Sequence, residues 1–330
     1  MSYTTSAHLS RGQISIAIAG GTGSLGREIS TVFLTAPYRV FFSQVIVFTR
    51  DINSASARAL AGLGAVLHQI VAQPDSGSED KDVLRDALRG VDAVINALGG
   101  DADKGLMDRL FDAALASGVA VYFPSEFGAD HRLNNFPGFE HEVWAHKREH
   151  AARARARVVE NSGDMKIIAV YVGWFMEEAI RPIYGFDTDR GVYTCYGSPS
   201  QKFALTSKAD VARAVAELSI LSMSPVMASS VPDHVRIAGQ IASYEKVKDV
   251  VKQETGIEVT LASEDLRQHK VRLEENRAEG PIEYIRVLMG EGKLDFSGDV
   301  QNELVNPDER SWKWKTLEDE IREVKGGVLR

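Results

Sequence analysis

The chain has little cysteine and no excess of basic residues. Its 330 residues include one cysteine, Cys195, and the formal net charge at pH 7 is −8. A single cysteine excludes an internal disulfide and a thiolate metal cluster. The acidic balance argues against nucleic-acid binding, which needs a clustered basic surface.

Long apolar runs are also missing. No run approaches the length of a membrane span, and residues 1–11 lack the apolar core of a signal peptide. The remaining composition, 44% hydrophobic and 25% charged, is ordinary for a globular protein. We therefore expect a cytoplasmic protein that binds a small molecule, without nucleic acid or membrane, as a monomer or homodimer.

The most informative stretch is rich in glycine. An apolar run from Ile14 to Ala19 leads into Gly20-Gly21-Thr22-Gly23-Ser24-Leu25-Gly26, and a helical segment over 27–34 follows. Glycines allow positive φ and close approach of a ligand, and a helix N-terminus attracts phosphate. Alone, the pattern also fits an ordinary tight turn. Between a strand and a helix it predicts a dinucleotide-binding turn.

Short apolar runs then alternate with amphipathic segments, as in βαβ units. The expected strands are 44–49, 65–71, 93–98, 119–123 and 166–172, and the expected helices are 54–63, 82–89, 104–117 and 141–161. Later segments are less regular, with short strands at 235–238 and 258–261 and helices at 244–254, 264–278, 282–289 and 316–324. The fold class is therefore α/β, a Rossmann-type doubly wound parallel sheet with a smaller C-terminal substrate lobe.

The end of the second expected strand bears on the choice of cofactor. Arg50 follows that strand directly, and Arg58 lies on the next helix, from which it could reach back. An arginine here suits a 2′-phosphate, whereas an acid such as Asp51 would hold a ribose 2′-hydroxyl. Arg50 could also be a solvated cation at the strand end. We favour NADPH over NADH, and we expect an NADP-binding domain over 12–180 and mainly a substrate-binding lobe over 181–330, without a clean boundary.

Two strings carry a family resemblance. The glycine stretch and Tyr122-Phe123-Pro124-Ser125-Glu126-Phe127-Gly128 together resemble the isoflavone-reductase-like, NmrA-like branch of the atypical short-chain dehydrogenases. That branch includes phenylcoumaran benzylic ether and pinoresinol–lariciresinol reductases. The phrase from Leu88 to Gly99 is similar to the same family's fourth-strand region. The resemblance covers most of residues 14–180 well and the remainder loosely.

The resemblance implies roles for individual residues. Gly20, Gly23 and Gly26 would hold the pyrophosphate, while Thr22, Ser24 and Leu25 would offer backbone N–H groups. Arg50 would pair with the 2′-phosphate. The remaining cofactor contacts would be Ala97, Leu98 and Gly99 beside the ribose and Pro124, Ser125, Glu126 and Phe127 beside the nicotinamide. Glu126 and Phe127 could instead merely lock their loop in place.

Catalysis in this family depends on one lysine, and the resemblance points to Lys147. Such a lysine can act as a general acid or base when burial lowers its pKa. Counting back from the string Val158-Val159-Glu160-Asn161-Ser162-Gly163 without gaps reaches Ala152, so Lys147 requires a helix about a turn longer than the family pattern. The alternative is a solvated lysine on a helix face.

Other motifs compete with this interpretation. Tyr244 and Lys248 have the spacing of the ordinary short-chain dehydrogenase pair but lie too far along the chain, so we interpret them as helix-surface residues. The histidines at 131, 141, 146 and 150 form no recognisable metal pattern and are expected to be solvated, although His141 or His146 could lie near the substrate; no metal site is predicted.

Aromatic residues suggest where a substrate binds. Trp174, Phe175 and Met176 follow an expected strand and, with Phe127, could stack on a flat apolar substrate; Phe136 and Phe139 could extend this wall. Core packing would equally explain them.

The sequence therefore predicts an NADPH-dependent reductase of a small apolar, aromatic or polyketide-like substrate, with hydride transfer from nicotinamide C4 and Lys147 as general acid or base. A non-catalytic NADP-binding redox sensor, as NmrA-like regulators are, and a cofactor-retaining isomerase or epimerase remain alternatives.

Overall fold

The structure, a computed structural model, describes residues 12–70, 79–100, 102, 104–133, 140–161, 163–277 and 280–324. The chain forms two compact units. The first unit comprises Met1–Glu126, His146–Val170 and Val211–Val235, and the second comprises Phe127–Ala145, Tyr171–Asp210 and Arg236–Arg330. These two units interleave along the sequence. The predicted boundary after residue 180, between a cofactor-binding domain and a substrate-binding lobe, remains a prediction.

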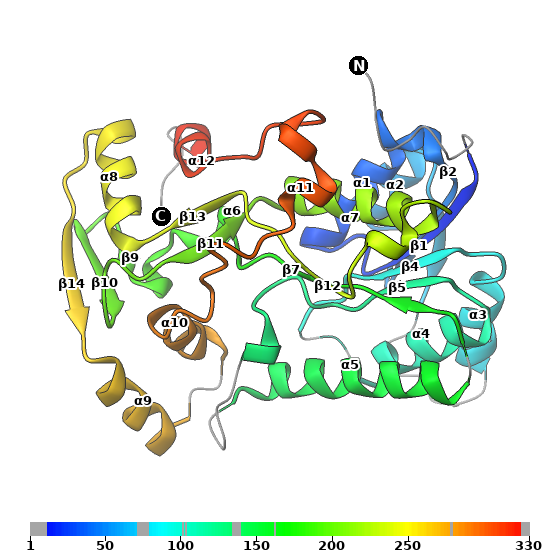
Figure 1. Cartoon of the computed structure of the whole chain (residues 1–330), viewed down its shortest axis with the longest axis horizontal. Helices are drawn as coiled ribbons and strands as arrows, with labels where there is room; N and C mark the ends of the chain where they lie inside the picture. Colours follow the sequence, from blue (N-terminus) through cyan, green and yellow to red (C-terminus); the bar gives the residue numbers. More distant parts are fainter. Residues whose placement is uncertain are drawn as a thin grey trace. The chain divides into compact units, whose positions relative to one another are not determined.

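A six-stranded sheet forms the centre of the first unit (Figure 1). Its order is β3-β2-β1-β4-β5-β6, and neighbouring strands pair in parallel throughout. The strands are β1 (Ile14–Ala19), β2 (Phe42–Thr49), β3 (Val66–Gln69), β4 (Ala93–Asn96), β5 (Val121–Phe123) and β6 (Lys166–Ile167). This order defines a Rossmann-type sheet, whose direction of winding reverses between β1 and β4. The predicted fold class is confirmed.

Helices cover both faces of this sheet. Figure 1 shows α1, α2 and α7 on one side and α3, α4 and α5 on the other. Their bounds are α1 (Ser24–Leu34), α2 (Ala55–Gly62), α3 (Glu79–Ala87), α4 (Lys104–Ala116), α5 (Glu142–Glu160) and α7 (Lys208–Met223), with the short helix η2 at Tyr38–Phe41. All six residues of β1 are buried, as expected for a parallel strand with helices on both faces.

The second unit is built from smaller sheets. One has the order β14-β10-β9 and another the order β13-β11-β8, and each mixes parallel with antiparallel pairing. The strands are β8 (Trp174–Phe175), β9 (Phe186–Asp187), β10 (Val192–Tyr196), β11 (Phe203–Thr206), β13 (Gln240–Ala242) and β14 (Thr260–Glu264). A separate pair joins β7 (Ala169–Tyr171) to β12 (His234–Arg236), and most residues of these two strands belong to the first unit.

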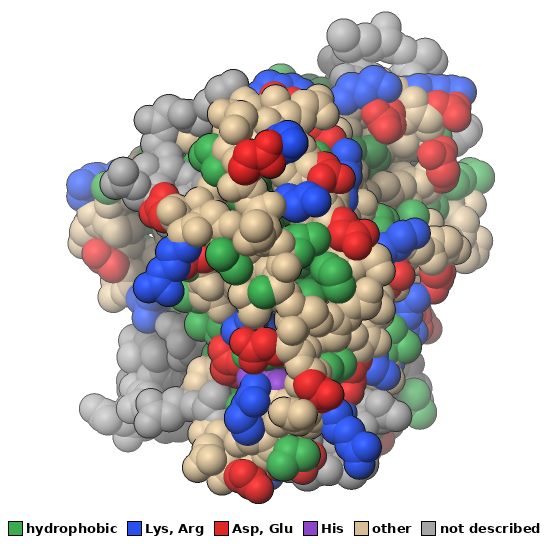
Figure 2. Space-filling model, turned by 90° about the vertical axis from the view of Figure 1, so that its left-hand side faces the viewer, with side chains coloured by type: hydrophobic (Ala, Val, Ile, Leu, Met, Phe, Trp, Pro, Cys, Tyr) green, Lys and Arg blue, Asp and Glu red, His purple; other side chains and the backbone are tan. Residues whose placement is uncertain are grey.

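Helices and a mixed surface complete this second unit. The α-helices are α6 (Met176–Ala179), α8 (Tyr244–Thr255), α9 (Leu266–Glu275), α10 (Ile282–Gly290), α11 (Asn302–Val305) and α12 (Leu317–Val324), and the short helices of the chain beyond η2 are η3 (His131–Leu133), η4 (Pro182–Tyr184), η5 (Ala228–Ser230) and η6 (Pro307–Glu309). Figure 2 shows basic and acidic side chains interspersed with hydrophobic ones over one face of the molecule. No helix among the described residues combines the length and the apolar character needed to cross a bilayer.

One predicted strand is corrected by the structure, and five strands were not predicted. The expected strand 166–172 is divided into β6 and β7 at Ile168, whose N–H bonds to the Tyr122 carbonyl at 3.0 Å. The unpredicted strands are β8, β9, β10, β11 and β13. None of them is longer than five residues, so local periodicity carries little signal.

Candidate active site

The glycine turn after β1 is closely packed. Gly20 has φ of +73°, and a Cβ there would lie 2.7 Å from the carbonyl oxygen of Ala97. A Cβ on Gly26 would lie 2.1 Å from the carbonyl oxygen of Gly20. Both contacts are far shorter than real Cβ contacts, so these two positions require glycine. The turn therefore brings the backbone after β4 against the backbone after β1.

The first turn of α1 completes a phosphate cradle. Gly23 is the N-cap residue: its N–H donates to the Gly20 carbonyl at 2.9 Å, and its own carbonyl accepts the N–H of Arg27 at 2.9 Å. The N–H groups of Leu25 and Gly26 precede that first intrahelical bond and point out of the helix N-terminus. Such a terminus, with the positive end of the helix dipole, suits a pyrophosphate.

The end of β2 lies beside this turn. The hydroxyl groups of Thr22 and Thr49 are 2.9 Å apart. Asp51 accepts the N–H of Asn53 at 2.8 Å, so one of its oxygens holds the local loop. Arg58 donates to the Asn53 carbonyl, whereas Arg50 is exposed. Thus Arg58 supports the loop and Arg50 presents its guanidinium to solvent at the strand end.

The loops after β4 and β5 are joined by side chains. The Ser125 hydroxyl donates to the Leu98 carbonyl at 2.6 Å, and the Leu98 N–H donates to the Asn96 side-chain oxygen at 3.1 Å. Pro124 and Glu126 are buried, and the Glu126 N–H bonds to the Pro124 carbonyl at 2.7 Å. Both loops follow the carboxyl ends of parallel strands, the edge where such sheets bind ligands.

Lys147 lies at the loop after β5. Its amine donates to the Glu126 carbonyl at 3.2 Å, and the residue is half-buried on α5. Burial lowers the pKa of Lys147, and the negative charge of Glu126 opposes that shift. Desolvation therefore brings this amine closer to the range in which it can exchange a proton at neutral pH.

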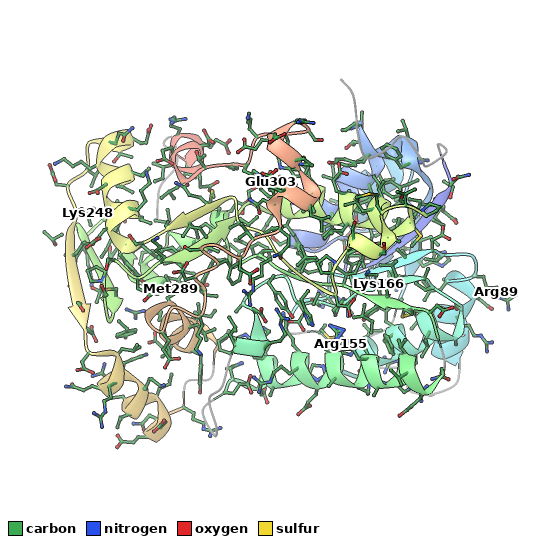
Figure 3. All side chains as sticks on the ribbon, in the orientation of Figure 1. Arg89, Arg155, Lys166, Lys248, Met289 and Glu303 are labelled. Atoms are coloured by element: carbon green, nitrogen blue, oxygen red, sulfur yellow. The ribbon has the colours of Figure 1, made fainter. Side chains whose placement is uncertain are left out.

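The rival tyrosine and lysine have other partners. Tyr244 is 4% exposed and donates from its hydroxyl to the Tyr184 carbonyl at 2.6 Å. Lys248, labelled on α8 in Figure 3, lies 3.5 Å from Asp249 in an ion pair. The expectation that both are surface residues is wrong for Tyr244, because its ring packs into the core of the second unit.

The histidines were also expected to be solvated, and for three of them this is wrong. His131, His141 and His150 are 4%, 8% and 4% exposed. The ring of His141 packs against Tyr284 at 5.3 Å, and His150 bonds to Asp108 at 2.8 Å. In the described part of the chain, no three His, Cys, Asp or Glu side chains are grouped so as to hold a metal ion.

The predicted substrate wall belongs to the second unit. Trp174 and Phe175 are half-buried; the Trp174 ring packs on Tyr184 at 4.1 Å, and the Lys208 amine lies 5.3 Å from the centre of the Phe175 ring. Phe127 and Met176 are 7% and 1% exposed, so core packing accounts for them. Phe136 and Phe139 lie outside the described residues.

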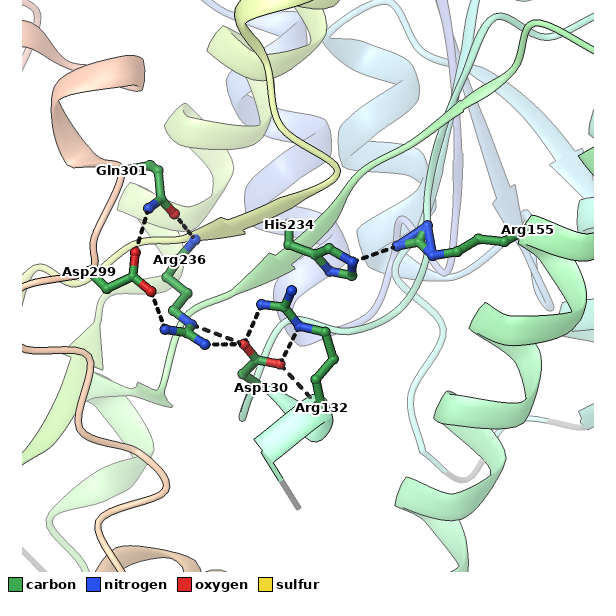
Figure 4. A network of polar contacts seen from close by, with 7 residues as sticks. All are labelled: Asp130, Arg132, Arg155, His234, Arg236, Asp299 and Gln301. Atoms are coloured by element: carbon green, nitrogen blue, oxygen red, sulfur yellow. Dashed lines mark hydrogen bonds and ion pairs between the residues drawn. The ribbon is translucent and has the colours of Figure 1, made fainter. Parts of the chain in front are cut away.

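Sequence reasoning missed a polar network that holds the chain after Phe127. Asp130 is fully buried between Arg132 and Arg236, each donating to it at 2.6 Å (Figure 4). Arg236 also pairs with Asp299. Figure 4 also shows Arg155 of α5 donating to His234, at 3.2 Å, within the first unit. The spacing of these residues in sequence gives no signal of either contact.

A second missed group lies behind the loop after β4. Asn96, Tyr122 and His150 are buried and hydrogen-bonded in series, ending at Asp108. They come from β4, β5, α5 and α4. The buried asparagine at the end of a strand was the one available sequence signal, since buried polar side chains need partners.

The fold and the glycine turn define a Rossmann-type dinucleotide-binding protein. Residues 13–319 match the NmrA-like family, and the chain belongs to that family. It is 28% identical over 276 residues to the oxidoreductase aprR of Aspergillus flavus, covering 84% of this chain and 86% of that protein. It is 25% identical over 287 residues to an NmrA-like family domain-containing oxidoreductase of Gibberella moniliformis, covering 83% and 87%.

Solved structures share the fold. AtPrR2 with NADP+ and (+)-pinoresinol has a TM-score of 0.71 at 19% identity, over 94% of this chain and 98% of that one. Isoflavone reductase has a TM-score of 0.71 at 18% identity, over 94% and 99%. Leucoanthocyanidin reductase of Vitis vinifera, solved with NADPH, has a TM-score of 0.69 at 18% identity, over 94% and 98%. These structures show a shared fold, and the match of residues 13–319 to the NmrA-like family confirms the predicted family resemblance.

Proposed function

We propose that this protein is an NADPH-dependent reductase of a small, apolar, aromatic or polyketide-like substrate. The observation that carries the proposal is Lys147, a half-buried amine 3.2 Å from the Glu126 carbonyl, at the carboxyl edge of the parallel sheet. That edge is where open α/β sheets bind their ligands. Two relatives named as oxidoreductases support the same activity.

The chain holds the cofactor mainly through backbone. The N–H groups of Leu25 and Gly26 bind the pyrophosphate, in the space that glycines at 20, 23 and 26 leave open. The exposed guanidinium of Arg50 binds the 2′-phosphate in a charge-assisted contact. The loops of Ala97 to Gly99 and Pro124 to Phe127 flank the nicotinamide half. NADP+ or NADPH in the similar structures supports this assignment.

Lys147 acts as the general acid or base. NADPH, when bound, supplies the hydride for the electrophilic carbon of the substrate. In its protonated, ammonium form Lys147 donates a proton to the oxygen on which charge develops, directly or through one water, and is left as the neutral amine. Its lowered pKa, caused by burial, makes that donation easier than from a solvated lysine. The Glu126 carbonyl orients the amine through the 3.2 Å hydrogen bond.

Trp174 and Phe175 are the proposed substrate contacts. Both are half-buried aromatic side chains, so each leaves part of its ring uncovered for a flat molecule to stack on. One of the similar structures contains (+)-pinoresinol, an aromatic molecule, and that ligand of a similar protein favours the same substrate class here.

Replacing Lys147 tests the proposal. Lys147→Ala should bind NADPH within about threefold of the wild type but lose turnover by about 10²–10⁴-fold, the usual contribution of general acid–base catalysis. NADPH binding is followed by its fluorescence, and turnover by NADPH oxidation across a panel of aromatic ketones, quinones and lignans. Lys166→Ala is the matched control, because Lys166 also donates to a backbone carbonyl, that of Ala228, at 3.1 Å.

Three results would contradict the proposal. Unchanged turnover in Lys147→Ala removes the lysine from the mechanism. Tight NADPH binding with no oxidation across the panel favours the redox sensor. Substrate conversion without net NADPH consumption favours the isomerase or epimerase.

A further inference from the structure

A chain of hydrogen bonds runs through the first unit to the backbone after β4. The His150 Nδ1 and Asp108 Oδ1 atoms are 2.8 Å apart, and His150 Nε2 lies 3.2 Å from the Tyr122 hydroxyl. The Asn96 amide donates to that hydroxyl at 3.1 Å, and the Asn96 oxygen accepts the Leu98 N–H at 3.1 Å. The chain therefore joins α4, α5, β5 and β4.

The direction of every bond in this chain follows from its two ends. The Asp108 carboxylate can only accept, so His150 donates from Nδ1 and its Nε2 is left as an acceptor. The Tyr122 hydroxyl therefore donates to His150, and it accepts from the Asn96 amide. Asn96 is then oriented with its oxygen toward the Leu98 N–H. A neutral His150 sets the orientation of each later group.

The Leu98 peptide is held on both sides. Its N–H bonds to Asn96 and its carbonyl accepts the Ser125 hydroxyl at 2.6 Å. The preceding carbonyl, of Ala97, faces Gly20 so closely that a Cβ on Gly20 would lie 2.7 Å away. A displacement of Asn96 would therefore move the segment that the proposed function puts beside the nicotinamide ribose.

The central hydrogen-bonded side chains of this series are buried. Tyr122 and Asn96 are fully buried and His150 is 4% exposed, and the Phe111 ring packs against Tyr122 at 5.2 Å and against His150 at 6.1 Å. A group in the chain that loses its partner has no solvent to replace it, and an unsatisfied buried polar group is costly. The loss of one hydrogen bond in this series therefore forces the other side chains of the series to rearrange.

We propose that Tyr122 and His150 are positioning residues, which fix the Leu98 segment in the arrangement that receives the nicotinamide half of NADPH. The proposal rests on the proposed function, because that function puts the nicotinamide beside Leu98. It adds residues that do not touch the cofactor and act through Asn96. The adenine half of the cofactor is assigned to the start of α1 and to Arg50, none of which belongs to this series of hydrogen bonds.

The protonation state of His150 controls the same arrangement. A proton on Nε2 would turn this atom into a donor, so the Tyr122 hydroxyl would receive two donors and lose its own acceptor. Burial lowers the pKa of His150, and Asp108 opposes the shift. The groups that face His150 are Asp108 from α4, His146 and Arg153 from α5, and Tyr122 from β5. The ordered chain therefore persists at neutral pH and is lost as the pH falls through the lowered pKa of His150.

Two ligands separate the halves of the site. NADPH contains the nicotinamide half, and adenosine 2′,5′-bisphosphate contains only the adenine side. Tyr122→Phe should weaken NADPH binding about fivefold to tenfold and leave adenosine 2′,5′-bisphosphate binding within about twofold. Tyr193→Phe is the matched control, because Tyr193 is also fully buried and its hydroxyl lies 2.9 Å from that of Thr188. It should change neither affinity by more than about twofold.

Variants of His150 give a second, independent arm. His150→Gln retains an acceptor for Tyr122 and should bind NADPH within about twofold of the wild type at neutral pH, whereas His150→Leu should lose about fivefold. On acidification from neutral pH to the lowest pH at which both proteins stay folded, NADPH affinity should fall more in the wild type than in His150→Gln. The 2′-phosphate of NADPH titrates in both proteins and cancels in this comparison.

Either of two results overturns the proposal: equal NADPH affinities in Tyr122→Phe and Tyr193→Phe, or coincident pH profiles for the wild type and His150→Gln. An equal loss of affinity for NADPH and for adenosine 2′,5′-bisphosphate would likewise show that these hydrogen bonds support overall stability and do not position the Leu98 segment. These failures leave wild-type NADPH binding and the effect of Lys147→Ala intact, so they are distinguishable from failure of the proposed function.

Discussion

The two units differ in where their proposed binding determinants lie. In the first unit the determinants of cofactor binding are mainly backbone groups, with the Arg50 side chain as the exception: the positive φ of Gly20, the missing Cβ of Gly26 and the N–H groups at the start of α1. In the second unit they are side chains, such as the half-buried rings of Trp174 and Phe175. Backbone determinants require particular residue types at fixed spacing, whereas a packed aromatic wall accepts many residues. The first unit is therefore suited to one constant cofactor and the second to a substrate that can change.

The largest expected effect comes from disrupting the backbone of the glycine turn in the first unit. Gly26→Val puts a Cβ 2.1 Å from the Gly20 carbonyl oxygen and must open the turn. We expect NADPH affinity to fall about a thousandfold, or about 4 kcal/mol, measured by fluorescence titration. Gly62→Ala on α2 is the control, because nothing lies within 4 Å of the added methyl. Similar affinities for the two variants would show that the close turn is not the cofactor cradle.

The second prediction concerns a buried side-chain network in the second unit. Asp130→Asn keeps the shape but removes the buried charge between Arg132 and Arg236. Unfolding free energy should fall by about 3 kcal/mol, measured by denaturant titration. Glu258→Gln is the control; its pair with Lys252 is exposed on both sides, 74% and 58%, so solvent screens it and its loss should change stability much less than Asp130→Asn does. Equal losses would mean that the network in Figure 4 is not a stabilising element.

The same network has a pH signature. Burial raises the pKa of Asp130, but the hydrogen bonds and charges of Arg132 and Arg236 outweigh it, and the pKa lies below its ordinary value. The stabilisation is therefore complete above the ordinary carboxyl pKa and is lost as the pH falls through the lowered one. The difference in stability between the wild type and Asp130→Asn should shrink in that acidic range and stay constant at neutral pH.

The smallest expected effect concerns Arg50, a side chain of the first unit that is proposed to bind the 2′-phosphate. Arg50→Gln removes an exposed guanidinium at the end of β2. NADPH affinity should fall about tenfold, or about 1.4 kcal/mol, with NADH affinity unchanged. Arg58→Gln should discriminate less between the two cofactors, because Arg58 already donates to the Asn53 carbonyl. Equal losses for NADPH and NADH in Arg50→Gln would show that this residue does not read the 2′-phosphate.

Backbone features set by local sequence could be predicted, whereas contacts between residues distant in sequence could not. The glycine turn could be predicted because Gly20 and Gly26 satisfy steric demands that no other residue meets, and the parallel strands because they are buried runs between amphipathic helices. The division of the expected strand at Ile168 could not, since it occurs where the chain leaves β5: the next residue, Ala169, donates its N–H to the carbonyl of Asp233, which is distant in sequence. The buried histidines were misjudged because a polar side chain on a helix gives no indication of its tertiary partner.

The candidate site shows the limit more sharply. The assignment of the family's lysine to Lys147 requires a helix about a turn longer than the family pattern, and α5 runs from Glu142 to Glu160. Its contact with the Glu126 carbonyl joins residues 21 positions apart. Asp108, Asn96, Tyr122 and His150 come from four separate elements, and no local spacing could bring them together.

The interleaving of the two units has a consequence for biosynthesis. Each unit consists of three chain segments, and the first is complete only when Val235 has been made. The first unit therefore cannot be complete on the ribosome before more than two thirds of the 330 residues have emerged, although the last strand of its parallel sheet, β6, ends at Ile167. Until then the glycine turn and β1 to β5 exist without the α7 segment that covers one face. A nascent chain of this protein should depend on chaperones longer than one whose domains follow each other along the sequence.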